Sequence, residues 1–144
     1  MLDDFRFVQH FRVVLADIDL LRHVNNVAYL RWCETARSEY FHEVIGGRID
    51  GQHGIIQAKI EFTYERQMRY REDVAVGCRV TRIGNKSFDI GYEIWSKTQA
   101  VRCAYGATPL VAYDYLAQTP IAVPAEWRAR ILAFERVPPE MKAA

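Results

Sequence analysis

Residues 16–29 of the chain read ADIDLLRHVNNVAY, which places two carboxylates, an imidazole and two carboxamides within ten residues. No other ten-residue stretch of the sequence contains this combination of side chains. It follows a predicted strand and leads into a predicted helix, and such a junction presents side chains and unpaired backbone N–H groups to a ligand. We therefore take residues 16–29 as the candidate functional segment and the remainder of the chain as its scaffold.

The residues flanking this segment predict a strand before it and a long helix after it. Phe5 to Leu15 is rich in Phe and Val and partly alternates, as an extended strand does. From Asn26 onward, apolar side chains recur at spacings of four, three, four and four, which is a helical stripe: Tyr29, Cys33, Ala36, Tyr40 and Val44. We expect this helix to be buried over much of its girth and to end at Gly46. Its N-cap is either Asn25 or Asn26, because a carboxamide oxygen there accepts an N–H of the first turn.

Beyond the helix and a Gly-containing loop, alternating apolar residues predict four antiparallel strands. They occupy residues 58–65, 74–80, 88–94 and about 100–115, and a turn at Gly84 joins two of them as a hairpin. Pro109 should lie at an edge or a bulge, because it has no N–H for the ladder. Pro124 opens a short helix that ends at Pro138. The order of strand, long helix, four meandering strands and short helix implies an α+β fold, with a curved five-stranded antiparallel sheet around the long helix.

Length, charge and cysteine count narrow the class of protein. A chain of 144 residues without repeats or linkers is expected to form a single domain over residues 1–144. The formal net charge of +1, with both signs interspersed, gives no case for a nucleic-acid partner or a membrane partner. The chain shows no signal-peptide pattern and no apolar run long enough to span a bilayer, so a cytoplasmic location is expected. The three cysteines are far apart and are expected to be small core residues.

Several runs carry a family resemblance: Asp17 to Asp19, His23 to Leu30, Glu34 to Arg37, and further matches within residues 60–62, 70–73, 83–88 and 110–114. Together they resemble the 4-hydroxybenzoyl-CoA thioesterase-like family of hotdog-fold acyl-CoA thioesterases, over roughly residues 8–116. The resemblance implies the hotdog fold and a homodimer or homotetramer with the active site at a subunit interface. It also implies hydrolysis of an acyl-CoA thioester with no metal and no organic cofactor, CoA being part of the substrate.

The resemblance also implies which residues act. The catalytic carboxylate falls on Asp19, as nucleophile or general base, and the oxyanion-polarising backbone amide falls on Asn26. Chemistry supports these roles, because a thioester carbonyl is already electrophilic and helix N-terminal N–H groups stabilise a developing oxyanion. Asp19 can reach the helix if residues 20–24 form a compact loop. His23 can then hydrogen-bond the carboxylate or the carbonyl, or deliver a proton to the leaving thiolate.

Other residues in these runs carry two interpretations each. Asn25 is a cap or a substrate contact, and Tyr29 is a core residue or a pocket wall. Glu34 contacts substrate or pairs with a neighbouring arginine three residues away. Lys86 and Ser87 are candidates for binding the phosphates of CoA.

Asp17 is interpreted as a structural hydrogen-bond acceptor in a loop or an interface. The sequence departs from the family at Leu21, where some members carry an asparagine, and at Gln67, where a proline is frequent. A metal site built from Asp17, Asp19 and His23 lacks further ligand-spaced residues.

Two further functions fit the same pattern. The acyl donor can be an acyl carrier protein rather than CoA, which calls for a basic rim beside the pocket to meet an acidic carrier. Alternatively, the chain is a catalytically silent module that binds acyl-CoA, an interpretation that Leu21 supports. The sequence does not distinguish aliphatic from aromatic acyl groups.

Overall fold

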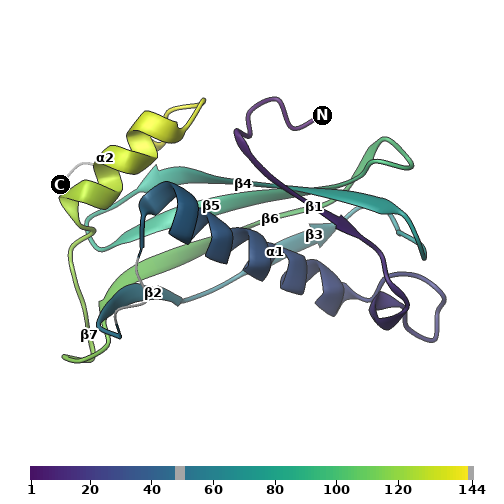
Figure 1. Ribbon diagram of the computed structural model, residues 1–144, viewed down its shortest axis with the longest axis horizontal. Helices are drawn as coiled ribbons and strands as arrows, with labels where there is room; N and C mark the ends of the chain where they lie inside the picture. Colours follow the sequence, from purple (N-terminus) through teal and green to yellow (C-terminus); the bar gives the residue numbers. More distant parts are fainter. Residues whose placement is uncertain (48–50, 143–144) are drawn as a thin grey trace.

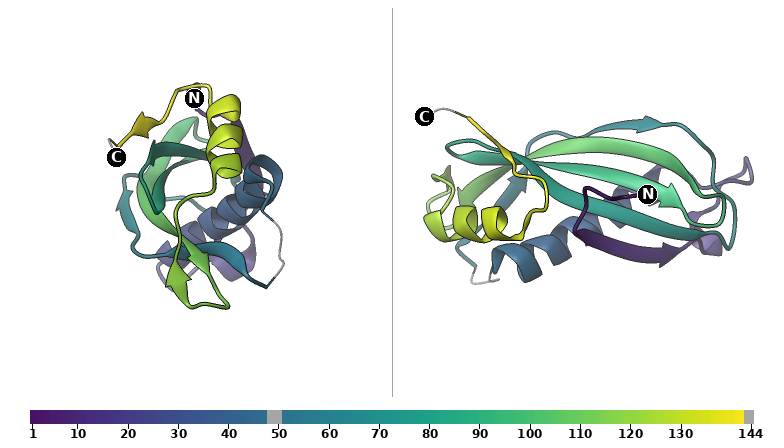
Figure 2. Two further views of the ribbon diagram at one scale, coloured as in Figure 1. Left: turned by 90° about the vertical axis from the view of Figure 1, so that its left-hand side faces the viewer. Right: turned by 90° about the horizontal axis from the view of Figure 1, so that it is seen from above.

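The long helix α1 (Asn26–Tyr40) lies against a curved sheet that curls around it (Figure 1). This computed structural model describes residues 1–47 and 51–142. A second helix, α2 (Ala125–Phe134), covers one end of the assembly. The two ends of α1 therefore have different surroundings, with α2 near its C-terminal end and the candidate segment at its N-terminal end (Figure 2).

The main strands of the sheet are β1 (Phe7–Arg12), β2 (His53–Gln57), β3 (Glu61–Tyr64), β4 (Asp73–Ile83), β5 (Ser87–Ser96) and β6 (Val101–Asp114). They pair antiparallel in the order β1-β4-β5-β6-β2, and β3 pairs with β6 beside β2. Two-residue strands extend the edges: β7 (Thr119–Pro120) on β6 and β8 (Glu140–Met141), parallel to β4. The five expected strands thus correspond to β1, β4, β5, β6 and the interrupted β2–β3 row.

The predicted meander is wrong in two respects. Residues 53–57, expected as loop, form β2, and the strand expected at 58–65 is shortened to β3. The strand that follows β3 in the chain does not pair with it, because β4 lies between β1 and β5 while β3 pairs with β6. Alternation in a sequence identifies strands but not their long-range partners, so the sequence could not give this order.

Pro109 lies in β6, an interior strand, opposite the break between β2 and β3. Its carbonyl accepts the Ala58 N–H (3.3 Å), and the Thr108 hydroxyl donates to the Lys59 carbonyl within the same break. Because the N and carbonyl of one strand residue face the same side, the missing N–H of Pro109 also faces this interruption. Pro109 thus lies at an edge only locally, where β6 has no partner between β2 and β3, although β6 as a whole is an interior strand.

Helix α1 is built as its sequence predicts at both ends. The Asn25 side chain accepts the Ala28 N–H (3.0 Å) as N-cap. A π-helical turn (Phe41–Ile45) extends the helix to Gly46, whose φ of +74° suits a glycine. The helix is buried along one face only, so the expected burial over much of its girth is wrong. The buried residues are Ala28, Tyr29, Trp32, Cys33, Ala36 and Tyr40.

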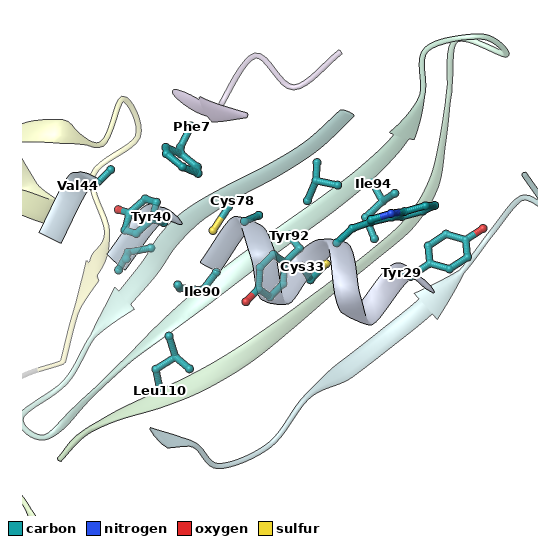
Figure 3. Packing of buried hydrophobic residues seen from close by; sticks show 14 of the residues in the cluster. Phe7, Tyr29, Cys33, Tyr40, Val44, Cys78, Ile90, Tyr92, Ile94 and Leu110 are labelled. Carbon is teal, nitrogen blue, oxygen red and sulfur yellow. The ribbon is translucent and has the colours of Figure 1, made fainter. Parts of the chain in front are cut away.

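The core lies between α1 and the sheet (Figure 3). Alternate residues of β5 point inward, including Ile90, Tyr92 and Ile94, and they meet the buried face of α1. All three cysteines are reduced and buried, as expected for core residues. The C-terminal helix ends at Phe134, four residues before the predicted stop at Pro138. No helix within residues 1–47 and 51–142 has both the length and the apolar character needed to span a membrane.

Candidate active site

Residues 18–24 form a tight loop immediately before α1. An isolated bridge pairs Ile18 with Val24, the Asp19 N–H donates to the His23 carbonyl (3.3 Å), and the Arg22 N–H donates to the Asp19 carbonyl (3.1 Å). Arg22 adopts a positive φ of +67° to close the turn. The loop is thus compact, which is the condition under which Asp19 was expected to reach the helix.

The two aspartates of the segment have opposite environments. Asp17 is only 4% exposed, accepts the Val14 N–H (2.9 Å) and pairs with Arg31 (2.7 Å). The Asp17 carbonyl accepts the Asn25 N–H (2.9 Å), which fixes the chain just before the helix. Asp17 is therefore a structural acceptor, as predicted.

Asp19 is exposed, and its Oδ1 accepts only the local Leu21 N–H (2.8 Å) among the side-chain contacts of the described residues. This contact orients the carboxylate without neutralising it. The Oδ2 atom has no hydrogen-bond partner within the described part of the chain, so it is available to a water or a substrate.

The N-terminus of α1 contributes backbone donors to the same region. Asn25 uses its side chain to cap the Ala28 N–H, and for the N–H groups of Asn26 and Val27 no acceptor is found among residues 1–47 and 51–142. These unpaired donors and the partial positive charge of the helix terminus favour an anion or a developing oxyanion.

A cavity of about 460 Å³ brings the loop and the helix terminus together. Its lining comes from the loop, the first turn of α1 and the end of β3: Asp19, His23, Val24, Asn26, Tyr29, Tyr64, Glu65, Arg66 and Gln67. Asp19, His23, Asn26 and Tyr29, which the sequence placed in the site, thus share one cavity. An acidic group, an imidazole and free backbone N–H groups around one cavity can perform acyl transfer to water.

Two tyrosines form the wall between α1 and β3. The Tyr29 hydroxyl donates to the Arg66 carbonyl and the Tyr64 hydroxyl to the Asn26 carbonyl, both at 3.4 Å, and the rings meet edge to face at 5.1 Å. Burial raises the pKa of Tyr29 strongly, with Cys103 and Tyr64 adding to the effect. Tyr29 therefore remains a neutral donor and is both a core residue and a pocket wall.

The other four predicted contacts do not line this cavity: Asn25, which caps the helix, and Glu34, Lys86 and Ser87. Glu34 is exposed, and the expected ion pair is not found among the described residues, because Arg31 pairs with Asp17 and Arg37 donates to the Tyr92 hydroxyl (3.4 Å). The ion pair was expected because the helix was expected to be largely buried. Glu34 is exposed instead, and an exposed carboxylate can remain solvated without a partner.

Lys86 and Ser87 belong to the turn between β4 and β5 and the start of β5. This turn lies at the opposite end of the sheet from the segment that precedes α1 (Figure 1). The start of β4, Asp73, pairs with Arg12 near the site, and β4 then runs for 11 residues toward α2. An α2 residue, Arg128, donates to the carbonyls of the turn. Within one chain, these two residues are thus remote from the cavity.

The described residues hold no group of three or more His, Cys, Asp or Glu side chains arranged to bind a metal ion.

Comparison with known proteins identifies the family. A model of the thioesterase-like superfamily matches residues 13–144. The chain belongs to this superfamily. It is a thioester hydrolase with the hotdog fold, as the sequence resemblance predicted. Among curated proteins, no sequence matches this thioesterase.

Three solved structures illustrate the similarity of this thioesterase to known proteins. A thioesterase from Thermus thermophilus, complexed with coenzyme A and Zn, is 28% identical with a TM-score of 0.83, over 94% of this chain and 98% of that one. A predicted thioesterase from Bacillus stearothermophilus is 28% identical with a TM-score of 0.80, over 92% and 98%. The PA5185 protein from Pseudomonas aeruginosa is 26% identical with a TM-score of 0.83, over 92% and 94%.

Sequence reasoning missed the part of the thioesterase cavity that comes from β3 and the segment after it. Tyr64 was assigned to a strand, and Gln67 was noted only as a departure from the family. Arg66 also lines this cavity. Their approach to Asp19 depends on β3 pairing with β6, which no local pattern reveals.

Proposed function

We propose that the thioester hydrolysed by this protein is an acyl-CoA, with Asp19 as nucleophile or general base. The observation that carries the proposal is the cavity shared by the Asp19 carboxylate and the unpaired N–H groups at the start of α1. The solved thioesterase from Thermus thermophilus, complexed with coenzyme A, supports CoA as the thiol carrier.

The proposed reaction uses only side chains and backbone groups of the cavity. Asp19 either attacks the thioester carbonyl carbon, forming an anhydride that water then hydrolyses, or removes a proton from the attacking water. The oxyanion accepts hydrogen bonds from the N–H of Asn26 at the helix terminus. The C–S bond breaks, and His23 delivers a proton to the CoA thiolate. Asn25 holds the helix terminus in place by capping it.

We also propose that the active form is a homodimer or homotetramer without a metal or an organic cofactor. Within the described residues, β2 and β3 pair only with β6, which leaves one side of each strand open to another chain. Exposed apolar side chains also surround the site: Val14, Leu15, Leu20, Leu21 and Val27. A second subunit seated over this region would bury them.

A panel of acyl-CoAs with short, long and aromatic acyl groups tests the activity, with CoA release followed by a thiol reagent. We expect turnover of at least one member and slower turnover of the same acyl group on an acyl carrier protein. Faster turnover on the carrier would favour the carrier thioesterase. Tight binding of acyl-CoA without thiol release would favour the silent binding module, for which the exposed Leu21 beside Asp19 is the supporting observation.

A further inference from the structure

A second cleft, of about 760 Å³, adjoins the catalytic cavity. Its lining comes from the segment after β3 and from the turn between β5 and β6: Glu65, Arg66, Gln67, Arg69, Glu72, Thr98 and Gln99. Three of these residues, 65 to 67, also line the cavity that contains Asp19. A ligand that occupies both the cleft and the cavity would therefore contact residues 65–67, which line both.

Two guanidinium groups of the cleft, those of Arg66 and Arg69, form no ion pair with a carboxylate of the described residues. Arg66 and Arg69 are exposed, and within residues 1–47 and 51–142 neither side chain takes part in an ion pair or a hydrogen bond. The acidic residues of the lining are committed elsewhere. Glu65 pairs with Arg102 at 2.7 Å, outside this cleft.

The other acid, Glu72, also lines the cleft and is only 7% exposed. Its Oε1 accepts hydrogen bonds from the Ser96 hydroxyl (2.6 Å) and the Gln99 amide (2.7 Å), and its Oε2 accepts the Arg69 N–H (2.5 Å). Glu72 thus serves as a buried acceptor that holds the cleft wall, which leaves Arg66 and Arg69 as the solvent-facing charges.

The segment that carries the two arginines is fixed at several points. The N–H groups of Glu65 and Arg66 donate to the Cys103 carbonyl (2.7 and 3.1 Å), and Gln99 donates to the Gln67 carbonyl (2.9 Å). Met68, between the arginines, is fully buried, and its carbonyl accepts the Val24 N–H (2.8 Å) from the catalytic loop. The arginines are therefore held at set backbone positions relative to that loop, which lowers the entropic cost of binding a ligand.

We propose that Arg66 and Arg69 form a phosphate-binding subsite for the CoA part of the substrate. Guanidinium groups bind phosphate oxygens through paired N–H donors, and the phosphates of CoA lie in the leaving group, beyond the sulfur. This assignment rests on the proposed acyl-CoA function and replaces Lys86 and Ser87 as the phosphate contacts within one chain. The acyl group then occupies the space beside Asp19 and the nucleotide end lies against the arginines.

Calorimetric titration with free CoA tests the subsite without requiring hydrolysis. Pantetheine, which carries the same thiol arm but no phosphate, is the reference ligand. We expect Arg66→Gln and Arg69→Gln each to weaken CoA binding roughly tenfold and to leave pantetheine binding unchanged. The effect of both substitutions should shrink as ionic strength rises. Arg136→Gln, an exposed arginine beside the N-terminal segment, is the matched control and should bind CoA as the wild type does.

Equal affinity of the wild type for CoA and pantetheine, or wild-type CoA affinity in the double variant Arg66→Gln/Arg69→Gln, would overturn the subsite. The assay distinguishes this failure from failure of the catalytic proposal, because Asp19→Asn should abolish turnover while it leaves the CoA dissociation constant within about twofold of the wild type.

Discussion

Asp17 and Asp19 are separated by one residue, yet the chain uses them differently. Asp17 accepts the partly buried Val14 N–H and pairs with the Arg31 guanidinium, and Asp19 keeps an oxygen available to the cavity. The difference follows from the short helical turn at Leu15–Asp17, which directs the Asp17 side chain back onto the turn. Of two identical side chains, one therefore stabilises the loop and the other lines the cavity.

Replacement of Asp17 by alanine should destabilise the protein. The change leaves the Val14 N–H and Arg31 without their partner, which costs about 1–3 kcal/mol in the free energy of unfolding. Urea unfolding followed by circular dichroism measures the loss. Asp4→Ala, at an exposed position, is the control and should change stability by less than about 0.5 kcal/mol. Equal stability of the two variants would contradict the structural role of Asp17.

At the scale of elements, the C-terminal end of α2 is joined to α1 and β4 by one buried carboxylate. Glu135 accepts hydrogen bonds from the Tyr40 hydroxyl and the Val80 N–H (2.9 Å), and its Oε2 has no partner within the described residues. Burial raises the pKa of Glu135 from its ordinary value of 4.5, against the opposing effects of these hydrogen bonds and of Arg79 and Arg6.

The raised pKa predicts a pH dependence of stability. Between 4.5 and the raised pKa, the folded state binds a proton that the unfolded chain has released, so stability falls as pH rises through this window. Glu135→Gln removes the titration, so its stability relative to the wild type should increase with pH and then level off. Urea unfolding of both proteins from about pH 4 to 8 checks this. A stability difference that is independent of pH would refute it.

The elements show how far the sequence can be interpreted. Local signals fix the position of α1: the Asn25 cap, the stripe from Tyr29 to Tyr40 and the stop at Gly46. The start of α1 and the end of the turn that extends it could therefore be predicted from the sequence. The position of β3, which carries Tyr64, could not be predicted in this way, because it depends on pairing with β6 some 40 residues later in the chain.

The same distinction between local and long-range signals applies to the candidate site. The loop from Asp19 to Asn26 is contiguous, so its members could be identified together by spacing and by resemblance. Arg66 and Gln67 reach the cavity only through the folding of the sheet. Lys86 lies far from the cavity of its own chain for the same reason, since β4 carries its turn to the other end of the sheet.

At the scale of the whole molecule, the proposed oligomer links assembly to activity. The exposed apolar residues around the site, with Leu20 fully exposed in one chain, favour a second copy over this face. Sedimentation velocity should therefore give a dimer or tetramer at micromolar concentration. Specific activity should fall on dilution in step with dissociation. A monomer with undiminished activity at every concentration would contradict the interface proposal.

The central claim is that the Asp19 carboxylate performs the chemistry, and Asp19→Asn tests it most directly. Asparagine keeps the oxygen that accepts the Leu21 N–H, so the loop should persist while the charge is lost. On the best acyl-CoA of the panel, we predict that kcat falls about a hundredfold or more, while KM and thermal stability stay near wild type. Asp4→Asn should retain full activity. A kcat for Asp19→Asn within about twofold of the wild type, in a folded protein, would contradict the account.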